Sequence, residues 1–327
     1  MNLITGATGH LGNVLARELV ERGERVRALM LPGDSHCPLD HVDVKCIEGD
    51  VLDPDSLAAA MTGVDTVYHL AGIISILPGA DALMRRVNVE GVRNVATAAL
   101  EAGVERLVHV SSVHAFQRMP QGTLVDETIP LAAEHAAGTY DQTKAQGTLA
   151  ILEAVQNGLD AVVACPSAII GPYDFRGSLL GSTLVQYARR RLHFLVPGAY
   201  DFVDVRDVAH GLTLARDRGQ SGEIYILSGT YATLQEVKAS VQRAANVCSS
   251  HLVLPWRIAK GAAAVAQRVY KMANIKPQFT LYALRTLEEN AYFSNRKARQ
   301  ALGFEPRPLV ETLRDMLTWQ QQAPALA

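Results

Sequence analysis

Short apolar runs alternate with amphipathic segments through the first half of the chain. The apolar runs predict strands, and the segments with helical spacing predict helices, several of which end at a glycine. Strands are predicted at residues 2–5, 25–31, 44–48, 66–70, 107–110 and 161–165, and helices at 11–22, 53–61, 82–102 and 139–156. This alternation at short spacing predicts a parallel sheet with right-handed crossovers.

The pattern changes in the second half. Residues 166–200 hold many Gly, Pro and aromatic residues, and a predicted helix and strand at about 202–228 indicate that the chain returns to the sheet. From Leu234 onward the pattern predicts mostly helices. We therefore expect an α/β fold. It has a Rossmann doubly wound parallel sheet over residues 1–165 and a smaller, mostly helical substrate-binding part within 166–327.

Composition narrows the class of protein. Among 327 residues, 31 Lys and Arg are balanced by 33 Asp and Glu, so a nucleic-acid partner is not expected. The four cysteines form no CxxC pair and no His cluster accompanies them, which predicts a reduced, cytoplasmic protein without a metal site. There is no signal-peptide pattern and no apolar run of about 18 residues, so we expect no membrane span.

A glycine-rich stretch follows the first predicted strand, with the sequence GATGHLG at residues 6–12. Gly6 permits a tight turn, Gly9 lets a pyrophosphate approach the backbone, and Gly12 lets the next helix pack close to the strand. A helix N-terminus offers unpaired N–H groups and the positive end of its dipole. The setting therefore favours nucleotide binding over a strand-to-helix turn that binds nothing.

Two further stretches follow predicted strands. Asp50 follows the third strand, where its carboxylate could accept a hydrogen bond from an adenine amino group or cap a turn. The sequence YHLAG at 68–72 ends the fourth strand with small residues, where the backbone could approach a ribose or pack closely.

A possible catalytic group lies further along the chain. Tyr140 and Lys144 lie four residues apart on one face of a predicted helix, where an ammonium group could lower the pKa of a phenol. Tyr140 could then act as a general acid or base. The alternative is a surface pair.

Ser111 and Ser112 end a predicted parallel strand, at the sheet edge where ligands bind in open α/β folds. His114 follows them and is a candidate for the wall of a substrate pocket.

Together these motifs resemble an extended short-chain dehydrogenase/reductase, from the superfamily of NAD(P)-dependent epimerases, dehydratases and reductases. The order and spacing of the motifs carry the resemblance over nearly the whole chain. The matching motifs are TGATGHLG (5–12), GDVLD (49–53), YHLAG (68–72), NVEGVRNV (88–95), HVSS (109–112), YDQTK (140–144), PSAIIGP (166–172), FVDVRDVA (202–209) and KARQALGFEPRP (297–308).

The resemblance implies roles for individual residues. Ser112 would orient the substrate oxygen, Tyr140 would give or take its proton, and Lys144 would bind the nicotinamide ribose and lower the pKa of Tyr140. Asn88 would support Lys144. The implied cofactor-binding residues are Gly6, Thr8, Gly9, His10, Leu11, Gly12, Asp50, Val51, Leu70, Ala71, Gly72, Tyr140, Lys144, Pro166 and Ser167. The implied cofactor is NAD or NADP. The preference between the two stays open, because Met30 stands where an acid usually binds the ribose 2′-hydroxyl of NAD, and Leu31 stands where an arginine usually meets the 2′-phosphate of NADP.

Departures from the family's usual patterns indicate which branch of the family this chain resembles. Val113 and His114 stand where sugar-nucleotide dehydratases carry Asp-Glu, and the epimerase asparagine is missing from AIIGP at 168–172. The sequence at 171–181 is similar to dihydroflavonol-reductase-like and 3β-hydroxysteroid-dehydrogenase-like members. We expect an apolar substrate pocket built from several bulky residues. They are Tyr173, Phe175, Leu179, Leu180, Trp256 and Tyr270.

The resulting hypothesis is an oxidoreductase that acts on a mostly apolar ketone or secondary alcohol. A nucleotide-sugar epimerase with tightly bound NAD and a non-catalytic NAD(P)-binding regulator are the alternatives. A homodimer is expected through the helices at 82–102 and 139–156. The apolar, basic segment at 254–276 could be a lid, an ordinary amphipathic helix or a membrane-surface helix, and membrane contact is the least expected of the three.

Overall fold

The computed structural model describes most of the chain. The described residues are 1–35, 37–74, 80–134, 138–191, 194–248, 252–262, 284 and 287–322. Residues 263–276 of the apolar, basic segment lie outside them, as does Tyr270, so the predictions for these residues stay open.

The first half alternates strands and helices as predicted. Its elements are β1 (Asn2–Thr5), α1 (His10–Glu21), β2 (Val26–Met30), η1 (Cys37–Leu39), β3 (Lys45–Glu48), α2 (Pro54–Met61), β4 (Thr66–His69), α3 (Asp81–Arg85), η2 (Arg86–Gly91), α4 (Val92–Glu101), β5 (Arg106–Val110), η3 (Val113–Ala115), α5 (Thr139–Gln156) and β6 (Ala161–Pro166). The chain later returns through α7 (Val205–Arg218) to β10 (Ile224–Leu227). The strand β10 pairs with β6.

Seven parallel strands form the central sheet in the order β10-β6-β5-β4-β1-β2-β3. The chain runs outward from β1 to β3 and then crosses back to β4 on the other side of β1. Ligands bind at such a reversal, outside the carboxyl ends of the strands. The predicted doubly wound Rossmann fold is confirmed.

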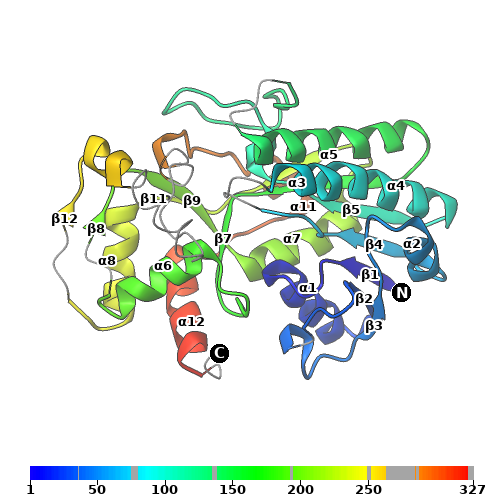
Figure 1. The fold of residues 1–327 in the computed structure, drawn as a ribbon, viewed down its shortest axis with the longest axis horizontal. Helices are drawn as coiled ribbons and strands as arrows, with labels where there is room; N and C mark the ends of the chain where they lie inside the picture. Colours follow the sequence, from blue (N-terminus) through cyan, green and yellow to red (C-terminus); the bar gives the residue numbers. More distant parts are fainter. Residues whose placement is uncertain are drawn as a thin grey trace.

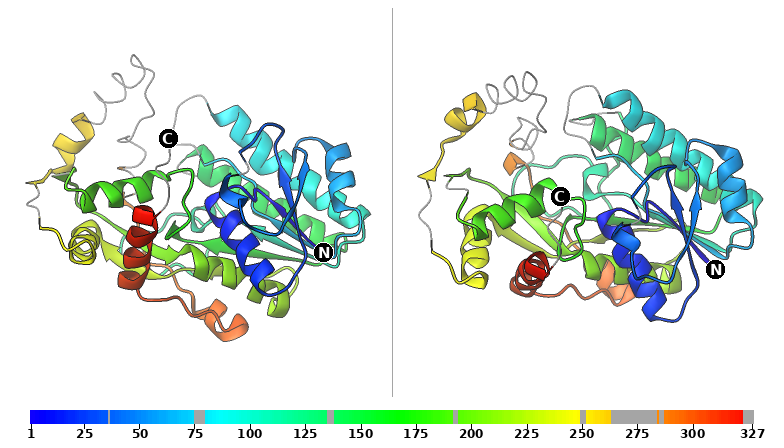
Figure 2. Two further views of the ribbon diagram at one scale, coloured as in Figure 1. Left: turned by 90° about the horizontal axis from the view of Figure 1, so that it is seen from below. Right: turned by 60° about the horizontal axis from the view of Figure 1, so that its bottom comes forward.

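Both faces of this sheet are covered by helices (Figures 1 and 2). The helices α2, α4 and α5 lie over one face, and α1, α7 and α11 (Arg296–Leu302) lie over the other. Neighbouring residues of β1 enter different cores, since Leu3 packs toward α4 and Ile4 toward α1 and α7. Burial on both faces explains why the strands are continuous apolar runs in the sequence.

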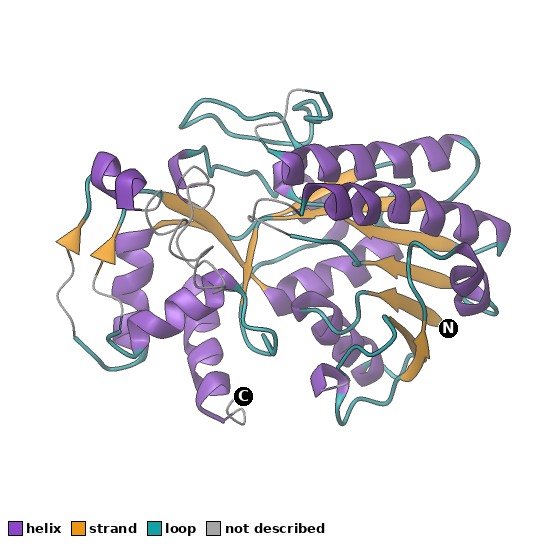
Figure 3. Ribbon diagram, viewed as in Figure 1, coloured by secondary structure: helices purple, strands orange, loops and turns teal. Residues whose placement is uncertain are grey.

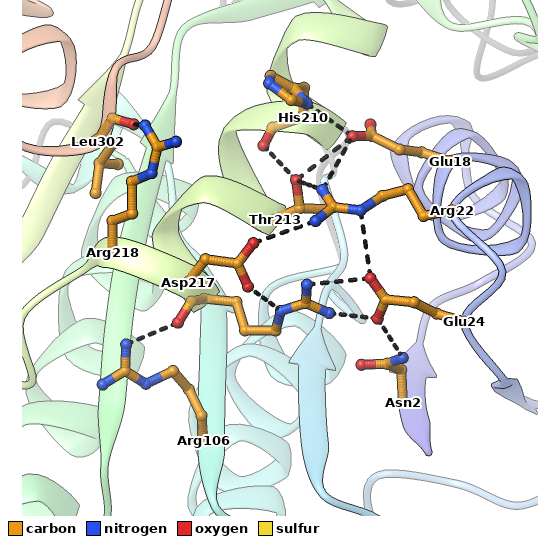
Figure 4. Close-up of polar contacts among 11 residues, drawn as sticks. Asn2, Glu18, Arg22, Glu24, Arg106, His210, Thr213, Asp217, Arg218 and Leu302 are labelled. Carbon is orange, nitrogen blue, oxygen red and sulfur yellow. Dashed lines mark hydrogen bonds and ion pairs between the residues drawn. The ribbon is translucent and has the colours of Figure 1, made fainter.

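The α1 and α7 helices are also joined by charged side chains (Figure 4). Glu18 accepts a hydrogen bond from His210 at 2.8 Å, and Arg22 donates to Thr213 at 2.7 Å. Arg216, also on α7, pairs with Glu24 just before β2. This network fixes α7 to the first strand–helix unit although almost 200 residues separate them in the sequence.

A second, smaller layer lies beside the large sheet (Figure 3). Its elements are β7 (Ala168–Ile170), α6 (Leu179–Ala188), β8 (Phe194–Leu195), β9 (Ala199–Asp204), β11 (Thr230–Thr233), α8 (Leu234–Ala244), β12 (Leu252–Val253) and α12 (Leu309–Gln322). The C-terminal region is helical as predicted, but it also holds a three-stranded sheet, β11-β9-β7, that the sequence pattern did not indicate. A strand as short as β7 cannot show a recognisable period.

The helix predicted at 82–102 is divided by the wide turn η2, which is π-helical and carries Asn88. Gly147 on α5 packs against this turn, and a Cβ atom there would lie 2.5 Å from the carbonyl oxygen of Asn88. The missing side chain thus lets α5 come close to the turn and sets the distance between them.

Replacing Gly147 by Ala is expected to lower the free energy of unfolding by about 1–3 kcal/mol, because the added methyl group overpacks the contact with η2. Urea unfolding would measure this. Glu153→Ala is a matched control, because Glu153 is exposed on the same helix and its replacement should change stability by less than about 0.5 kcal/mol. An unchanged midpoint for the Gly147 variant would show that the contact relaxes freely.

Candidate active site

The glycine loop joins β1 to α1 and packs tightly against neighbouring backbone. Gly6 has a left-handed φ of 71°, and a Cβ atom there would lie 2.8 Å from the backbone nitrogen of Ala71. A side chain on Gly12 would collide with the carbonyl oxygen of Gly6. No side chain caps the start of α1 at Gly9, which leaves the first N–H groups of α1 available to an anion. The loop therefore fits a phosphate-bearing cofactor such as NAD or NADP.

The backbone after β4 forms the opposite wall of this site. The N–H of Ala71 donates to the hydroxyl of Thr5 at 3.1 Å, which fixes the chain beside the glycine loop. A Cβ atom on Gly72 would lie 3.5 Å from the Lys144 amino nitrogen and 3.3 Å from the Asn88 side-chain oxygen. The missing side chain of Gly72 therefore lets this backbone lie close to Asn88 and Lys144.

Asp50 and Val51 lie after β3, on the adenine side expected from the resemblance. One carboxylate oxygen of Asp50 accepts from the N–H of Leu52 at 2.9 Å, so Asp50 caps its own turn. Val51 is buried against Gly91. The contact of Asp50 and Val51 with an adenine ring stays a prediction.

Ser112, Tyr140 and Lys144 come together at the carboxyl end of β5. Ser112 follows β5, and its side chain hydrogen-bonds to that of Tyr140 on the first turn of α5. Lys144 lies one turn further along α5 and donates to the carbonyl oxygen of Val110 at 3.0 Å. All three side chains are largely buried. Ser111 instead hydrogen-bonds to Thr148 at 2.6 Å within the core, so Ser112 has the better position to meet a substrate.

Burial dominates the proton affinities of this group. It raises the pKa of Tyr140 to about 12, while the hydrogen bond with Ser112 acts in the opposite direction. It lowers the pKa of Lys144 to about 8. The net shift of Tyr140 is therefore upward, against the lowering that the resemblance implies, because burial outweighs every opposing influence.

Asn88 connects two walls of the site. Its side-chain oxygen accepts from the N–H of Ile73 at 2.8 Å, and its amide nitrogen donates to the carbonyl of Ile73 at 2.9 Å and to the hydroxyl of Thr143 at 3.2 Å. Asn88 thus fixes the chain after β4 to α5, and its contact on α5 is Thr143, the residue just before Lys144. Its described contacts would support Lys144 through α5 rather than by a direct hydrogen bond.

A cavity opens beside His114, which contacts Tyr140, and its described wall is mainly apolar. The ring of His114 lies edge-on to that of Tyr140, with 5.9 Å between centroids, and also lines the cavity. The apolar part of the wall comes from η3, β9 and the segment before α11. It includes Val113, Phe116, Met119, Tyr200, Ala291 and Phe293.

Five of the residues predicted for an apolar pocket are described, and none of them lines this cavity. Tyr173 and Phe175 pack against Trp319, and Leu180 and Trp256 pack against two other cores. The described wall of the cavity also lacks Leu179. Aromatic composition indicated an apolar pocket but could not show which distant segments would meet, so the assignment of these residues to a substrate pocket stays a prediction.

Charged residues missed in the sequence close one end of the cavity. Arg118 donates to Asp141 at 2.5 Å and pairs with Glu289, while Asp141 is buried, with 2% of its side chain exposed. His114 lies 3.7 Å from Asp141, but burial lowers the pKa of His114 more strongly than Asp141 raises it. The cavity therefore presents a neutral imidazole and a guanidinium already held by two carboxylates. No short-range motif signals this group, because it joins three separate segments.

The remaining cofactor candidates lie around the same edge of the sheet. Ser167 follows β6 and donates to Asp201 at 2.5 Å, which places Pro166 and Ser167 beside the cavity. His10 bonds the carbonyl oxygen of Pro172 at 2.8 Å, so its ring lies against a later segment. In the part of the chain that the structure describes, no His, Cys, Asp and Glu cluster could hold a metal ion, and no helix could cross a membrane.

The doubly wound fold and the site at the carboxyl ends of its strands define a class of protein, the dinucleotide-binding α/β enzymes. Residues 2–228 match the model of the NAD dependent epimerase/dehydratase family, and the chain belongs to that family. It is 35% identical to the sterol demethylase protein B of Methylococcus capsulatus over 97% of both chains. It is 30% identical to a 4-hydroxy-2-methyl-3-oxo-4-farnesyl-3,4-dihydroquinoline-1-oxide ketoreductase of Stigmatella aurantiaca, over 93% of this chain and 91% of the relative. The crystal structure of gox2253 superposes with a TM-score of 0.86 at 33% identity, over 98% of each chain.

These findings confirm the resemblance on which the site was predicted. The protein is an NAD(P)-dependent oxidoreductase of the extended short-chain type, and its cofactor is NAD or NADP. The roles of individual residues are not tested by the comparisons and remain predictions.

Proposed function

We propose that the protein transfers a hydride between a nicotinamide and a mostly apolar ketone or secondary alcohol. The observation that carries this proposal is the meeting of Ser112, Tyr140 and Lys144, with Tyr140 in contact with His114, a residue in the wall of a mainly apolar cavity. Ser112 holds the substrate oxygen, and Tyr140 donates or accepts its proton. Lys144 holds the nicotinamide ribose. The bound cofactor supplies or takes up the hydride at C4.

The substrate class rests on the cavity and on the relatives. Phe116, Tyr200 and Phe293 are apolar members of the described wall, and recognition of a hydrophobic ketone requires apolar side chains of this kind. Relatives named as a sterol demethylase protein and as a farnesyl-dihydroquinoline-oxide ketoreductase support the same class. We therefore favour steroidal and other polycyclic ketones over small polar ones.

Charge distinguishes this proposal from epimerisation of a nucleotide sugar. A nucleotide sugar carries a diphosphate, which proteins meet with cations or helix N-termini. In the described cavity wall the cation is Arg118, and it is already paired with Asp141 and Glu289. This favours an uncharged substrate. The presence of both Tyr140 and Lys144 favours an enzyme over a non-catalytic regulator.

The proposal is tested by the loss of reduced-nicotinamide absorbance with NADH or NADPH. Steroidal, aromatic and aliphatic ketones form the panel, and the Tyr140→Phe variant measures the background. We expect oxidation with at least one bulky ketone, and none above background in the variant. If no ketone is reduced, while protein with bound NAD converts UDP-sugars without net redox change, the epimerase alternative replaces this proposal.

We also propose a cytoplasmic homodimer that pairs through α4 and α5. Leu100 on α4 and Leu149 on α5 are large apolar side chains that are 41% and 43% exposed in the single chain. A second copy would cover apolar surface of this kind.

A further inference from the structure

Three side chains from distant parts of the chain meet at the glycine loop. Thr8 belongs to the loop, Asp34 follows β2, and Arg176 lies between β7 and α6. The Thr8 hydroxyl donates to Asp34 at 2.6 Å, and Arg176 donates to both carboxylate oxygens of Asp34 at 2.7 Å. Arg176 also donates to the hydroxyl of Thr8 at 2.7 Å and to its carbonyl at 3.1 Å.

The segment that carries Arg176 is firmly attached to the first strand–helix unit. Asn13 donates to the carbonyl of Tyr173 at 3.2 Å, and the guanidinium of Arg17 lies 4.9 Å from the centre of the Tyr173 ring. Tyr173 has a left-handed φ of 67°, which is uncommon for an aromatic residue and needs surrounding contacts to hold it. The position of Arg176 over the loop is therefore fixed by its neighbours as well as by Asp34.

This cluster lies where the two cofactors differ. In dinucleotide-binding folds an acid about 20 residues beyond the glycine loop accepts from the adenosine 2′-hydroxyl of NAD, or an arginine meets the 2′-phosphate of NADP. The usual positions at the end of β2 are apolar here, since they hold Met30 and Leu31. Asp34, a few residues later, brings a carboxylate back to the loop through Thr8, and Arg176 brings a cation from the other half of the chain.

The two charges have opposite consequences for the cofactor. Although partial burial acts to raise it, the pKa of Asp34 is held below its usual value by the hydrogen bonds from Thr8 and Arg176 and by the charge of Arg176. An ionised Asp34 can accept from a 2′-hydroxyl but repels a 2′-phosphate. Arg176 is paired with that carboxylate and so is not free to bind a phosphate.

We propose that Asp34 makes the protein select NAD(H), and that Arg176 is a latent ligand for a 2′-phosphate, which Asp34 keeps occupied. The pair connects the nucleotide-binding half to the segment before α6, so it also closes the adenosine side of the site. The inference rests on the dinucleotide site of the proposed function and is independent of the substrate and of hydride transfer.

The test measures dissociation constants of NADH and NADPH from nicotinamide fluorescence, with no substrate present. The wild-type protein should bind NADH at least about 10-fold more tightly than NADPH, because the contact of Asp34 with a 2′-phosphate is a like-charge contact. A 10-fold ratio corresponds to about 1.4 kcal/mol. Asp34→Asn keeps the oxygen that accepts from Thr8 but removes the charge. It should shift the ratio of the two dissociation constants toward NADPH by about 10-fold or more.

Arg176→Gln provides the second arm of the test. Added to Asp34→Asn, it should abolish the gain in NADPH affinity, and alone it should leave the preference for NADH in place. Thermal unfolding and retained NADH binding show that each variant is folded. The role of Asp34 would be overturned if the wild-type protein bound NADPH more tightly than NADH. It would also be overturned if the ratio of the two dissociation constants were the same in Asp34→Asn as in the wild type. A gain that survives in the double variant would overturn the role of Arg176. If no ketone is reduced but the dissociation constants of NADH and NADPH behave as expected here, only the proposed function is contradicted.

Discussion

Replacing Tyr140 by Phe is expected to lower kcat for ketone reduction by about 100- to 10,000-fold, the usual contribution of a positioned general acid. The phenyl ring fills the same volume beside His114 and Ser112 but has no proton to give. Because the hydroxyl acts on the substrate oxygen, the dissociation constant of the reduced cofactor should stay within about threefold of the wild-type value. Single-turnover absorbance and fluorescence titration measure the two effects separately.

Tyr187→Phe is the matched control for this experiment. Tyr187 is also buried, and its hydroxyl donates to the carbonyl of Phe194 at 3.1 Å, away from the candidate site. Its replacement removes a buried hydrogen bond without touching the cavity, so turnover should remain. A Tyr140 variant that loses cofactor binding together with turnover would contradict the role given to Tyr140.

Replacing Lys144 by Met is expected to weaken both turnover and cofactor binding. A hydrogen bond from a charged donor contributes about 1.5–3 kcal/mol, which corresponds to roughly a 10- to 100-fold loss of affinity. The nonpolar side chain of Met also removes the positive charge next to Tyr140. Full activity in this variant would contradict both the reductase and the epimerase schemes.

The same variant tests the burial of Lys144 through the pH dependence of stability. The pKa of Lys144 is about 8 in the folded protein, and a lysine in an unfolded chain has a pKa of about 10.4. Between these values the unfolded state binds more protons, so Lys144 makes the free energy of unfolding rise from about pH 8 to pH 10. Below pH 8 Lys144 is protonated in both the folded and the unfolded state, so it adds no pH dependence to the free energy of unfolding. Urea unfolding should show that Lys144→Met lacks this rise, and equal slopes for both proteins would contradict the lowered pKa.

The sequence allowed the large sheet to be predicted because both of its faces are buried. The strands therefore stand out as apolar runs, and glycines such as Gly23 and Gly63 mark helix ends. The Tyr140 and Lys144 pair was found because a helix brings residues four apart onto one face. These features depend on local spacing alone.

What escaped prediction depends on contacts between distant segments. The cavity wall combines Phe116 with Phe293, and Arg118 meets Glu289, across more than 170 residues. Nothing in either segment signals its partner. The upward shift in the pKa of Tyr140 was missed for a related reason, since the degree of burial follows from the completed fold and not from the neighbouring lysine.

The return of the chain to the first sheet has a consequence for protein synthesis. Ile4 and Leu15 share a core with Leu212 on α7 and with Phe304 just after α11. A ribosome releases the chain from its N-terminus at about 5–20 residues per second. The first strands and α1 therefore leave the exit tunnel many seconds before the residues that complete this core. During that interval one apolar face of the growing sheet lacks its native cover, so the nascent chain is a natural client for chaperones that bind apolar segments.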